Sequence, residues 1–462
     1  MWKDSTKEVH METGPIGKTL FIFTMPVLLC QLLQMLYNIT DCLVIGHWVG
    51  DTGLAAVGIG GLILSVIINF FIGFSSGISV IISHHFGAYR YSKVQTAIGT
   101  VVSLGLIIGV LLTAGGFFGA ERLLRWLNCP PDVLDDAVMF MTIAVFGLMP
   151  TLLYNIGTAV LRALGNTRTA LYLLTASTAL NLLLDLLFVA VLEWGMQGAA
   201  LATALSQFAL GVLIIRRISD LDPAYALTRQ RLRLSMSDLS EIVRLSMPAG
   251  MQALFMSISS LIIQLSINAF GSSAAAGMVI FAKLEGFIYY PTFAYGIALT
   301  GFIGQNFGAR RLDRVQEAVR FSIRTAIFFT IPLSILFTIF AEPLLSGFTT
   351  EAETLHHAVS AILWVLPAYA FYSVNQVYLG ALKGLGNTTY PMICTLVCYA
   401  VFRVLWCEGL FNIWWDMRVI YSSYSVSFLL MFAMVFIRWQ QVFRAKEEST
   451  APAASAVRVS HA

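Results

Sequence analysis

The sequence predicts an all-α integral membrane protein with about twelve transmembrane helices arranged as two parallel six-helix repeats. Three observations support this prediction: few charged residues, many apolar segments long enough to cross a bilayer, and two sets of matching loop motifs. Of the 462 residues, 58% are hydrophobic and 11% are charged, whereas an average soluble domain carries about 25% charged residues. So few charges cannot cover a large water-facing surface, and a large soluble enzyme therefore fits poorly.

The apolar segments favour helices rather than a β-barrel. A helix needs about 20 mostly apolar residues to cross the hydrocarbon core. The long apolar runs here show no alternation of apolar and polar residues, which barrel strands would require. The predicted spans have their centres near Cys30, Ile67, Ile108, Ala144, Ser177, Leu205, Ser259, Tyr290, Phe329, Leu366, Val397 and Leu430.

Lysine and arginine residues predict the orientation of these spans. They follow every even-numbered span, as Arg90 and Lys93 follow the second, and short cytoplasmic loops retain positive charge. Both termini are therefore expected in the cytoplasm. The longest polar stretch, Arg216–Glu241, is rich in arginine, but the positive-inside pattern explains it without nucleic-acid binding. The predicted parts are an N-terminal lobe (1–218), a cytoplasmic linker (219–240), a C-terminal lobe (241–446) and a disordered cytoplasmic tail (447–462).

Matching motifs indicate that the chain is an internal duplication. Most of the matches share an offset of about 221 residues, and an even number of spans in each copy gives both copies the same orientation. The pairs are Met25-Pro26 with Met247-Pro248, Phe86-Gly87-Ala88 with Phe307-Gly308-Ala309, and Leu161-Arg162-Ala163-Leu164-Gly165-Asn166-Thr167 with Leu382-Lys383-Gly384-Leu385-Gly386-Asn387-Thr388.

Polar residues in the first predicted span point to a binding site. An ionisable group at membrane depth costs about 2.5–3.5 kcal/mol on insertion scales, so it requires a reason. Asp41 shares one helical face with Gln34, Tyr37 and Asn38. This face could bind a proton, a small cation or substrate. Alternatively, Asp41 lies near the outer end of the span and simply faces water.

A second acidic residue lies in the fifth predicted span of the same half. Asp185 follows Asn181 by one helical turn, and Asn155 and Thr203 add polar groups in the fourth and sixth spans. Two carboxylates with amide and hydroxyl neighbours can exchange protons or hold Na+, so Asp41 and Asp185 are candidate coupling residues. Asp185 could instead accept a packing hydrogen bond.

The second half has a different set of intramembrane charges. Its eighth span carries Lys283 and Glu285, and its eleventh carries Arg403 and Glu408 in place of an Asn–Asp pair. Glu285 could attract a cationic substrate, or it could form a salt bridge with Lys283 or Arg403.

Aromatic and methionine side chains could line a cavity for flat apolar cations, although most will serve in helix packing. Met256 and Tyr290 are candidates for substrate contact. The sequence has no Walker-type phosphate-binding motif and no metal-ligand cluster, so neither ATP hydrolysis, another enzymatic activity, a bound metal nor a cofactor is expected.

These motifs together resemble the multidrug and toxic compound extrusion (MATE) family, with the greatest likeness to its DinF/MepA-like bacterial branch. The resemblance runs from about Gly17 to Arg444, and its most specific pieces are Met25-Pro26, Gly304-Gln305-Asn306-Phe307-Gly308-Ala309 and the paired Leu-Gly-Asn-Thr motifs. It implies a V-shaped pair of six-helix lobes that exchanges organic, often cationic compounds for H+ or Na+, working as a monomer among membrane lipids, and a bacterial inner membrane is the expected location.

The resemblance also implies roles for individual residues. It assigns the coupling ion to Asp41 and Asp185, with Asn181, Thr203 and, less directly, Asn155 in support. Glu285 matches an acidic position that helps to bind cationic drugs in the MepA-like branch. The seventh span lacks an acidic residue found in other branches, which weakens the case for a C-lobe ion site. A flippase for lipid-linked oligosaccharides, of the same superfamily, remains the alternative function.

Overall fold

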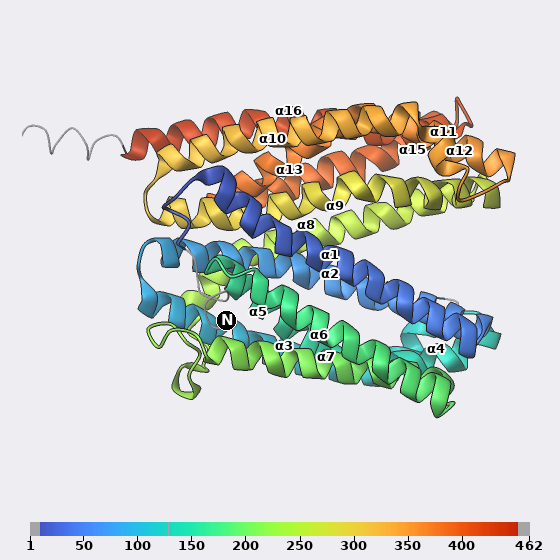
Figure 1. Ribbon diagram of the computed structural model, residues 1–462, viewed down its shortest axis with the longest axis horizontal. Coiled ribbons are helices and arrows are strands. Elements are labelled where there is room, and N and C mark those ends of the chain that lie inside the picture. Colours follow the sequence, from blue (N-terminus) through green and yellow to red (C-terminus); the bar gives the residue numbers. More distant parts are fainter. Residues whose placement is uncertain (1–9, 128, 451–462) are drawn as a thin grey trace, which may run out of the picture. The chain divides into compact units, whose positions relative to one another are not determined.

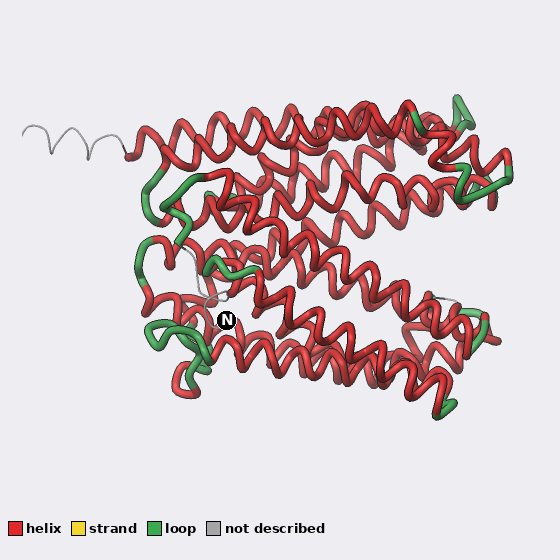
Figure 2. Tube along the Cα trace, in the orientation of Figure 1, coloured by secondary structure: helices red, strands yellow, loops and turns green. Residues whose placement is uncertain are grey.

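The computed structural model describes residues 10–127 and 129–450, and these residues are almost entirely helical (Figures 1 and 2). No strand occurs within these two ranges. The all-α prediction is therefore confirmed.

The described residues of the first half form seven α-helices. Val145–Gly147, a 3₁₀ turn, joins α4 to α5 so that the two form one span, and the π-helical segment Leu186–Val191 extends α6. The helices are α1 (Ile16–Trp48), α2 (Asp51–Gly87), α3 (Tyr91–Trp126), α4 (Pro131–Ala144), α5 (Leu148–Ala163), α6 (Arg168–Asp185) and α7 (Gly195–Ser219).

The second half repeats this pattern with small changes. Leu366–Ala368 is a 3₁₀ turn that joins α12 to α13, and Leu396–Val401 is a π-helical segment between α14 and α15. A short 3₁₀ turn, Arg229–Arg231, precedes this half. The helices are α8 (Met236–Asn268), α9 (Ser272–Gly308), α10 (Leu312–Ile339), α11 (Ala341–Leu345), α12 (Ala352–Val365), α13 (Tyr369–Gly384), α14 (Thr389–Thr395), α15 (Phe402–Phe411) and α16 (Met417–Thr450).

Eleven helical segments among the described residues are long and apolar enough to cross a membrane. The twelfth predicted span, centred near Tyr290, falls in α9, which is 37 residues long. α9 is not among these eleven segments, although its length is sufficient to cross a membrane. The chain is thus a multi-pass membrane protein.

Left-handed backbone positions in the turns reveal the duplication in three dimensions. Few non-glycine residues adopt a positive φ, so these positions mark specific turns. Three pairs share an offset of 221 residues: Gly50 and Gly271 (φ 93° and 99°), Tyr89 and Arg310 (55° and 57°), and Gly165 and Gly386 (82° and 84°). Both copies therefore share the backbone geometry of these three turns between helices.

The described chain forms two compact units. The first comprises residues 10–13 and Phe21–Ala253, and the second comprises Gly14–Leu20 and the chain from Leu254 onward. In the first unit α5 packs against α2, α3 and α7, and in the second α13 packs against α9, α10 and α16. These limits differ from those of the predicted lobes because the first helix of each half contributes to both units.

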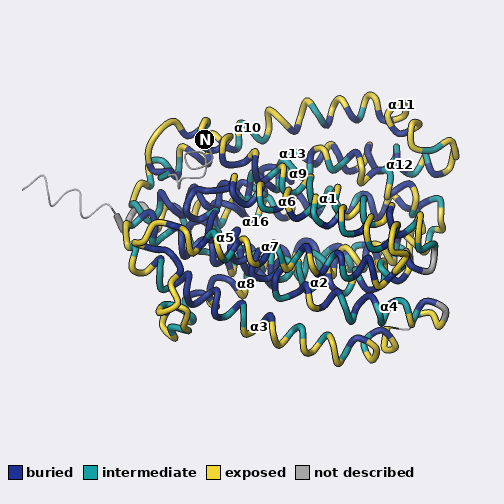
Figure 3. Tube along the Cα trace, turned by 60° about the horizontal axis from the view of Figure 1, so that its bottom comes forward, coloured by how far each residue is buried: buried dark blue, intermediate teal, exposed yellow. Residues whose placement is uncertain are grey.

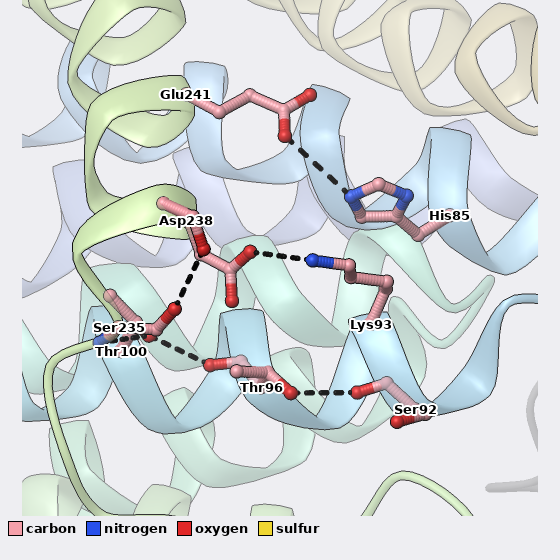
Figure 4. Close-up of polar contacts among 9 residues, drawn as sticks. His85, Ser92, Lys93, Thr96, Thr100, Ser235, Asp238 and Glu241 are labelled. Carbon is pink, nitrogen blue, oxygen red and sulfur yellow. Dashed lines mark hydrogen bonds and ion pairs between the residues drawn. The ribbon is translucent and has the colours of Figure 1, made fainter.

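The beginning of α8 belongs to the first unit, where it packs on α2 and α3 (Figure 4). Lys93 Nζ lies 3.2 Å from Asp238 Oδ1, and the backbone N–H of Ser235 donates to Thr100 Oγ1 at 3.3 Å. Farther along, a Cβ on Gly77 would lie 2.4 Å from the Cα of Ser246. The predicted linker also packs here, since Gln95 Nε2 donates to the carbonyl of Ala226 at 3.0 Å.

The beginning of α1 shows the reverse arrangement and belongs to the second unit. Arg314 in α10 donates to the carbonyl oxygen of Gly14 at 3.0 Å. A Cβ on Gly17 would lie 2.7 Å from the ring of Phe321, so this glycine permits a close approach to α10. At the other end of the chain α16 runs to Thr450, so residues 447–450 of the predicted tail are helical and 451–462 lie outside the described residues.

Exposed apolar side chains line the long helices, as expected for a surface that faces lipid. Exposed segments are visible along α3 and α10 (Figure 3). Phe118 in α3 and Phe328 in α10 are each 80% exposed. So many exposed large apolar side chains are unusual in water-soluble proteins, and they agree with a location in the membrane.

Candidate functional site

The two predicted coupling residues lie in the first unit and face each other. Asp185 ends the regular part of α6 and is only 2% exposed, and Asp41 is half-buried on α1. Their carboxyl groups are close enough to interact directly. Asp185 also immediately precedes the π-helical segment, and such segments occur frequently at functional sites. Residues 144 positions apart in the sequence thus form one acidic pair.

Several polar atoms around this pair have no protein partner. One oxygen of each carboxyl group (Asp41 Oδ1 and Asp185 Oδ2) and both side-chain amide atoms of Asn181 are buried without a hydrogen bond in the described part of the chain. Buried polar atoms are normally paired with protein, water or an ion. Two adjacent ionised carboxylates also repel each other. A proton or a monovalent cation at this place would relieve both penalties.

Hydroxyl groups from α1 and α7 surround the acidic pair. The buried Tyr37 hydroxyl lies near Thr203 and Ser206 and close enough to both carboxyl groups to feel their charge, but it makes no hydrogen bond within the described residues. Ser177 Oγ donates to the carbonyl oxygen of Ser206 at 2.9 Å, which joins α6 to α7 behind the pair. Tyr37 and Thr203 therefore lie beside the acidic pair.

The other predicted residues of the first half are placed differently. Asn155 Nδ2 donates to the carbonyl of Thr151 at 3.0 Å, so its amide donor is used within α5. Gln34 is half-buried on α1, and Asn38 is exposed. A role for these three residues in ion or substrate binding stays a prediction.

The second unit contains the remaining predicted residues. Tyr369 donates a hydrogen bond of 2.5 Å to Glu285 Oε1. Within the described ranges Glu285 forms no ion pair with Lys283 or Arg403, although the charge of Arg403 influences it. Tyr290 packs edge-on against Tyr289, with ring centroids 5.5 Å apart, and Met256 is half-buried on α8. Substrate contact by Glu285, Met256 and Tyr290 stays a prediction.

Arg403 has surroundings that the sequence interpretation missed. Its guanidinium carbon lies 4.6 Å from the ring centroid of Tyr399, 4.2 Å from that of Tyr424 and 5.7 Å from that of Phe428. Its Nε donates to Ser427 Oγ at 2.9 Å. The spacing of Tyr424 and Phe428 along α16 was a visible signal, but only the packing of α15 against α16 shows that they surround an arginine.

No cluster of three or more His, Cys, Asp or Glu side chains within residues 10–127 and 129–450 is placed to hold a metal ion. The acidic pair offers carboxylate oxygens. Such oxygens can accept a proton, and oxygen is also the ligand atom that hard cations such as Na+ prefer. Binding of a proton or Na+ by this pair stays a prediction.

The two repeated sets of long apolar helices define the class of multi-pass membrane proteins that are built from an internal duplication. The MatE family model matches the chain twice, over residues 26–187 and 248–407. The chain therefore belongs to the MatE family of membrane transporters, and each half carries one copy of the family's repeat.

Relatives of similar length carry names that describe drug resistance. Probable multidrug resistance protein YpnP of Bacillus subtilis is 27% identical over 94% of this chain and 97% of its own length. Probable multidrug resistance protein YoeA of the same organism is 26% identical over 84% of this chain and 85% of its own. Probable multidrug resistance protein NorM of Thermotoga maritima is 25% identical over 84% of each chain.

Solved structures share the fold. A MATE transporter in the bent conformation matches with a TM-score of 0.89 at 20% identity, covering 96% of this chain and 98% of that one. A MOP superfamily transporter from Pyrococcus furiosus, described as having a binding pocket of reverse polarity, matches with a TM-score of 0.87 at 21% identity over 96% and 99%. At these identities the likeness concerns the fold alone.

Proposed function

We propose that the protein is a secondary active exporter that exchanges small organic, often cationic compounds for H+ or Na+. The observation that carries this proposal is the buried pair of Asp41 and Asp185, with an oxygen of each left without a protein partner. The names of the relatives, which describe multidrug resistance, support the substrate class.

The acidic pair supplies a way to couple ion entry to drug release. With the pair deprotonated, the protein loads a cationic compound from the cytoplasm or the inner leaflet. Protonation of Asp41 or Asp185 from outside then neutralises the site, shifts α1 and releases the compound outward. A membrane potential contributes about 2.3 kcal/mol for each elementary charge moved through 100 mV, which is sufficient to drive uphill export.

The proposed orientation in the membrane follows from the charge pattern of the loops. Both termini lie in the cytoplasm, because lysine and arginine follow the even-numbered spans. The protein acts as a monomer, since one duplicated chain already supplies both halves, and the bacterial inner membrane is the proposed location.

Ethidium flux into proteoliposomes tests the proposal. Wild-type protein is expected to move ethidium under an imposed proton gradient without sodium, and the Asp41→Asn variant is expected to lose this flux. Asp135, an exposed carboxylate in the same unit, provides a matched control as Asp135→Asn, which should export normally.

The outcomes separate the alternatives. Flux that requires a sodium gradient would identify Na+ as the coupling ion and would still support the proposal that the protein is an exporter. Full proton-driven flux in Asp41→Asn would contradict the assignment of the coupling site. If the wild-type protein moves ethidium under neither gradient, the exporter proposal fails, and flipping of lipid-linked oligosaccharides is the function to assay next.

A further inference from the structure

The loop between α7 and α8 is folded onto the first unit. Tyr225 and Leu227 are buried in the core of this unit, and the backbone N–H of Leu227 donates to the carbonyl oxygen of Ile218 at 3.2 Å. The carbonyl oxygen of Arg231 lies directly against α3, because a Cβ on Gly99 would collide with it. These contacts fix the part of the loop that carries its arginines.

Three arginines lie within five residues of this loop. They belong to residues 229–233, which include a 3₁₀ turn and which we call the basic turn. Arg229 and Arg233 are exposed, and Arg231 is half-buried. No acidic side chain in the described ranges forms an ion pair with any of the three. The basic turn therefore presents positive charge that is not neutralised by these parts of the chain.

Three acidic residues near the basic turn are engaged elsewhere (Figure 4). Asp238 Oδ1 lies 3.2 Å from Lys93 Nζ, and Glu241 Oε2 lies 3.9 Å from His85 Nε2. On the other side of the basic turn, Asp222 Oδ1 accepts a hydrogen bond of 2.8 Å from a backbone N–H within its own turn. The charge of the basic turn is thus left for a partner outside the described chain.

Two apolar side chains are exposed beside these arginines. Leu232, inside the basic turn, is 42% exposed, and Met236, at the start of α8, is 73% exposed. The positive-inside pattern accounts for arginine in a cytoplasmic loop, but it does not account for exposed apolar side chains next to it. Basic and apolar side chains together are typical of segments at a membrane surface, where the apolar groups enter the lipid and the charges reach anionic headgroups.

The place of the basic turn in the first unit suits contact with lipid. The loop lies at the ends of α3 and α7 and extends sideways past α7 (Figures 1 and 2). Phe208 and Val212, one helical turn apart on α7, are 56% and 52% exposed, so this flank of α7 faces lipid. A loop just beyond such a flank lies at the level of the lipid headgroups.

We propose that the basic turn is a docking surface for the anionic phospholipid headgroups of the cytoplasmic leaflet. The guanidinium groups of Arg229 and Arg233 bind phosphate oxygens, which match their paired N–H donors. Leu232 and Met236 enter the boundary between headgroups and acyl chains. This surface rests on the proposed orientation of the chain and goes beyond the export function, because it is independent of the coupling ion and of the exported solute.

Stabilisation by lipid tests the docking surface. Full-length protein in a non-ionic detergent is titrated with phosphatidylglycerol or with phosphatidylcholine, and the midpoint of thermal unfolding is measured, since a ligand of the folded state raises this midpoint. Phosphatidylglycerol should raise the midpoint, more at low salt than at high salt, and phosphatidylcholine should have little effect. Arg229→Gln/Arg233→Gln should weaken the apparent affinity for phosphatidylglycerol about twenty-fivefold, at about fivefold for each basic residue near an anionic surface.

Two matched variants separate the basic turn from net charge and from packing. Arg122→Gln/Arg125→Gln removes two exposed arginines at the opposite end of α3, so it should leave the affinity for phosphatidylglycerol unchanged. Arg229→Lys/Arg233→Lys keeps the charge and should bind this lipid nearly as tightly as the wild type. If the glutamine variant of the basic turn does not fold, the comparison of the two lipids at low and high salt in wild-type protein carries the test.

An equal rise of the midpoint with both lipids would overturn the proposal, and so would an unchanged affinity in Arg229→Gln/Arg233→Gln. An equal loss of affinity in Arg122→Gln/Arg125→Gln would overturn it too, since net charge alone would then be the cause. Glycerol phosphate, a headgroup without acyl chains, should not raise the midpoint; a rise equal to that with phosphatidylglycerol would indicate a site for free phosphate and would also overturn the lipid surface. Failure of the proposed export function would look different: wild-type protein would transport no ethidium, while its stabilisation by phosphatidylglycerol would remain.

Discussion

The two units share their turns but differ in the charges that they bury. In the first, Asp41 and Asp185 face each other among hydroxyl and amide groups. In the second, Arg403 lies among aromatic rings, and Glu285 is hydrogen-bonded to Tyr369. The two halves therefore share turns of the same geometry, while the charged residues inside the two units differ.

The comparison of the two halves shows at which positions the fold constrains the backbone conformation. Tyr89 and Arg310 differ in size and charge, yet both adopt a left-handed conformation at the same turn. The backbone geometry is retained even where the side chain is free to change. Side chains inside the units face no such backbone constraint and can specialise.

The largest expected effect on transport comes from removing one carboxylate of the acidic pair in the first unit. We expect Asp185→Asn to reduce gradient-driven ethidium export to the level of empty vesicles, because the remaining carboxylate loses its partner for ion exchange. Export is measured in proteoliposomes with Asp135→Asn as the control. Full export by Asp185→Asn would show that the acidic pair is not the coupling site.

Helix packing offers the next test, because the two units differ in how closely their helices approach. In the second unit a Cβ on Gly380 would lie 2.6 Å from the carbonyl oxygen of Gly296, whereas the equivalent positions of the first unit hold Ala159 and Ser75. Gly380→Ala should therefore destabilise the protein by about 1–3 kcal/mol through overpacking.

The measurement for Gly380→Ala is the midpoint of thermal unfolding in detergent. Gly409→Ala is the matched control, since nothing lies within 4 Å of a Cβ at that position. Equal midpoints for the two variants would mean that α9 and α13 can separate at little cost.

A smaller effect is expected at the start of α8. Lys93 pairs with Asp238 in the first unit, while the equivalent cation of the second, Arg314, donates to the carbonyl of Gly14. Asp238 is buried but Lys93 is half-exposed, so their coupling should be only about 1 kcal/mol or less, and weaker at high salt.

A double-mutant cycle with Lys93→Met and Asp238→Asn measures this coupling from unfolding midpoints. The exposed pair Glu121–Arg125 serves as the control and should show less coupling. Coupling that is large and independent of salt would contradict a partly solvated ion pair.

The smallest effect concerns the turn between α2 and α3. A hydrogen bond from Tyr89 to Glu12 raises the pKa of the tyrosine to about 12. Arg310, at the equivalent turn, carries no phenol. The contribution of this hydrogen bond to stability is therefore present below about pH 10, the ordinary pKa of tyrosine, and is lost as the pH rises through the pKa of the folded state.

Ultraviolet difference spectra between the wild type and Tyr89→Phe follow this titration. In the Glu12→Gln background the pKa of Tyr89 should fall toward its ordinary value. An unchanged pKa in that background would show that Glu12 is not its cause.

The sequence predicted the helical class, the repeat and the acidic pair because these depend on local patterns and on burial of charge. Hydropathy and loop motifs located the spans, and even α9 was found despite Lys283 and Glu285. The aromatic surroundings of Arg403 could not be predicted, because they require the register between α15 and α16. The packing of residues 14–20 with the second half was equally hidden, since it joins segments 300 residues apart.

The first helix of each half contributes to both units. This arrangement has a consequence for how two separate halves could assemble and for where the chain could be cut into two polypeptides. The first unit needs residues 236–253 from the later half, and the second needs Gly14–Leu20 from the earlier half. A dimer of single, unfused halves would complete itself by exchanging these leading turns, as domain-swapped dimers do. Two polypeptides cut within the loop after α7 should accordingly reassemble when they are made together.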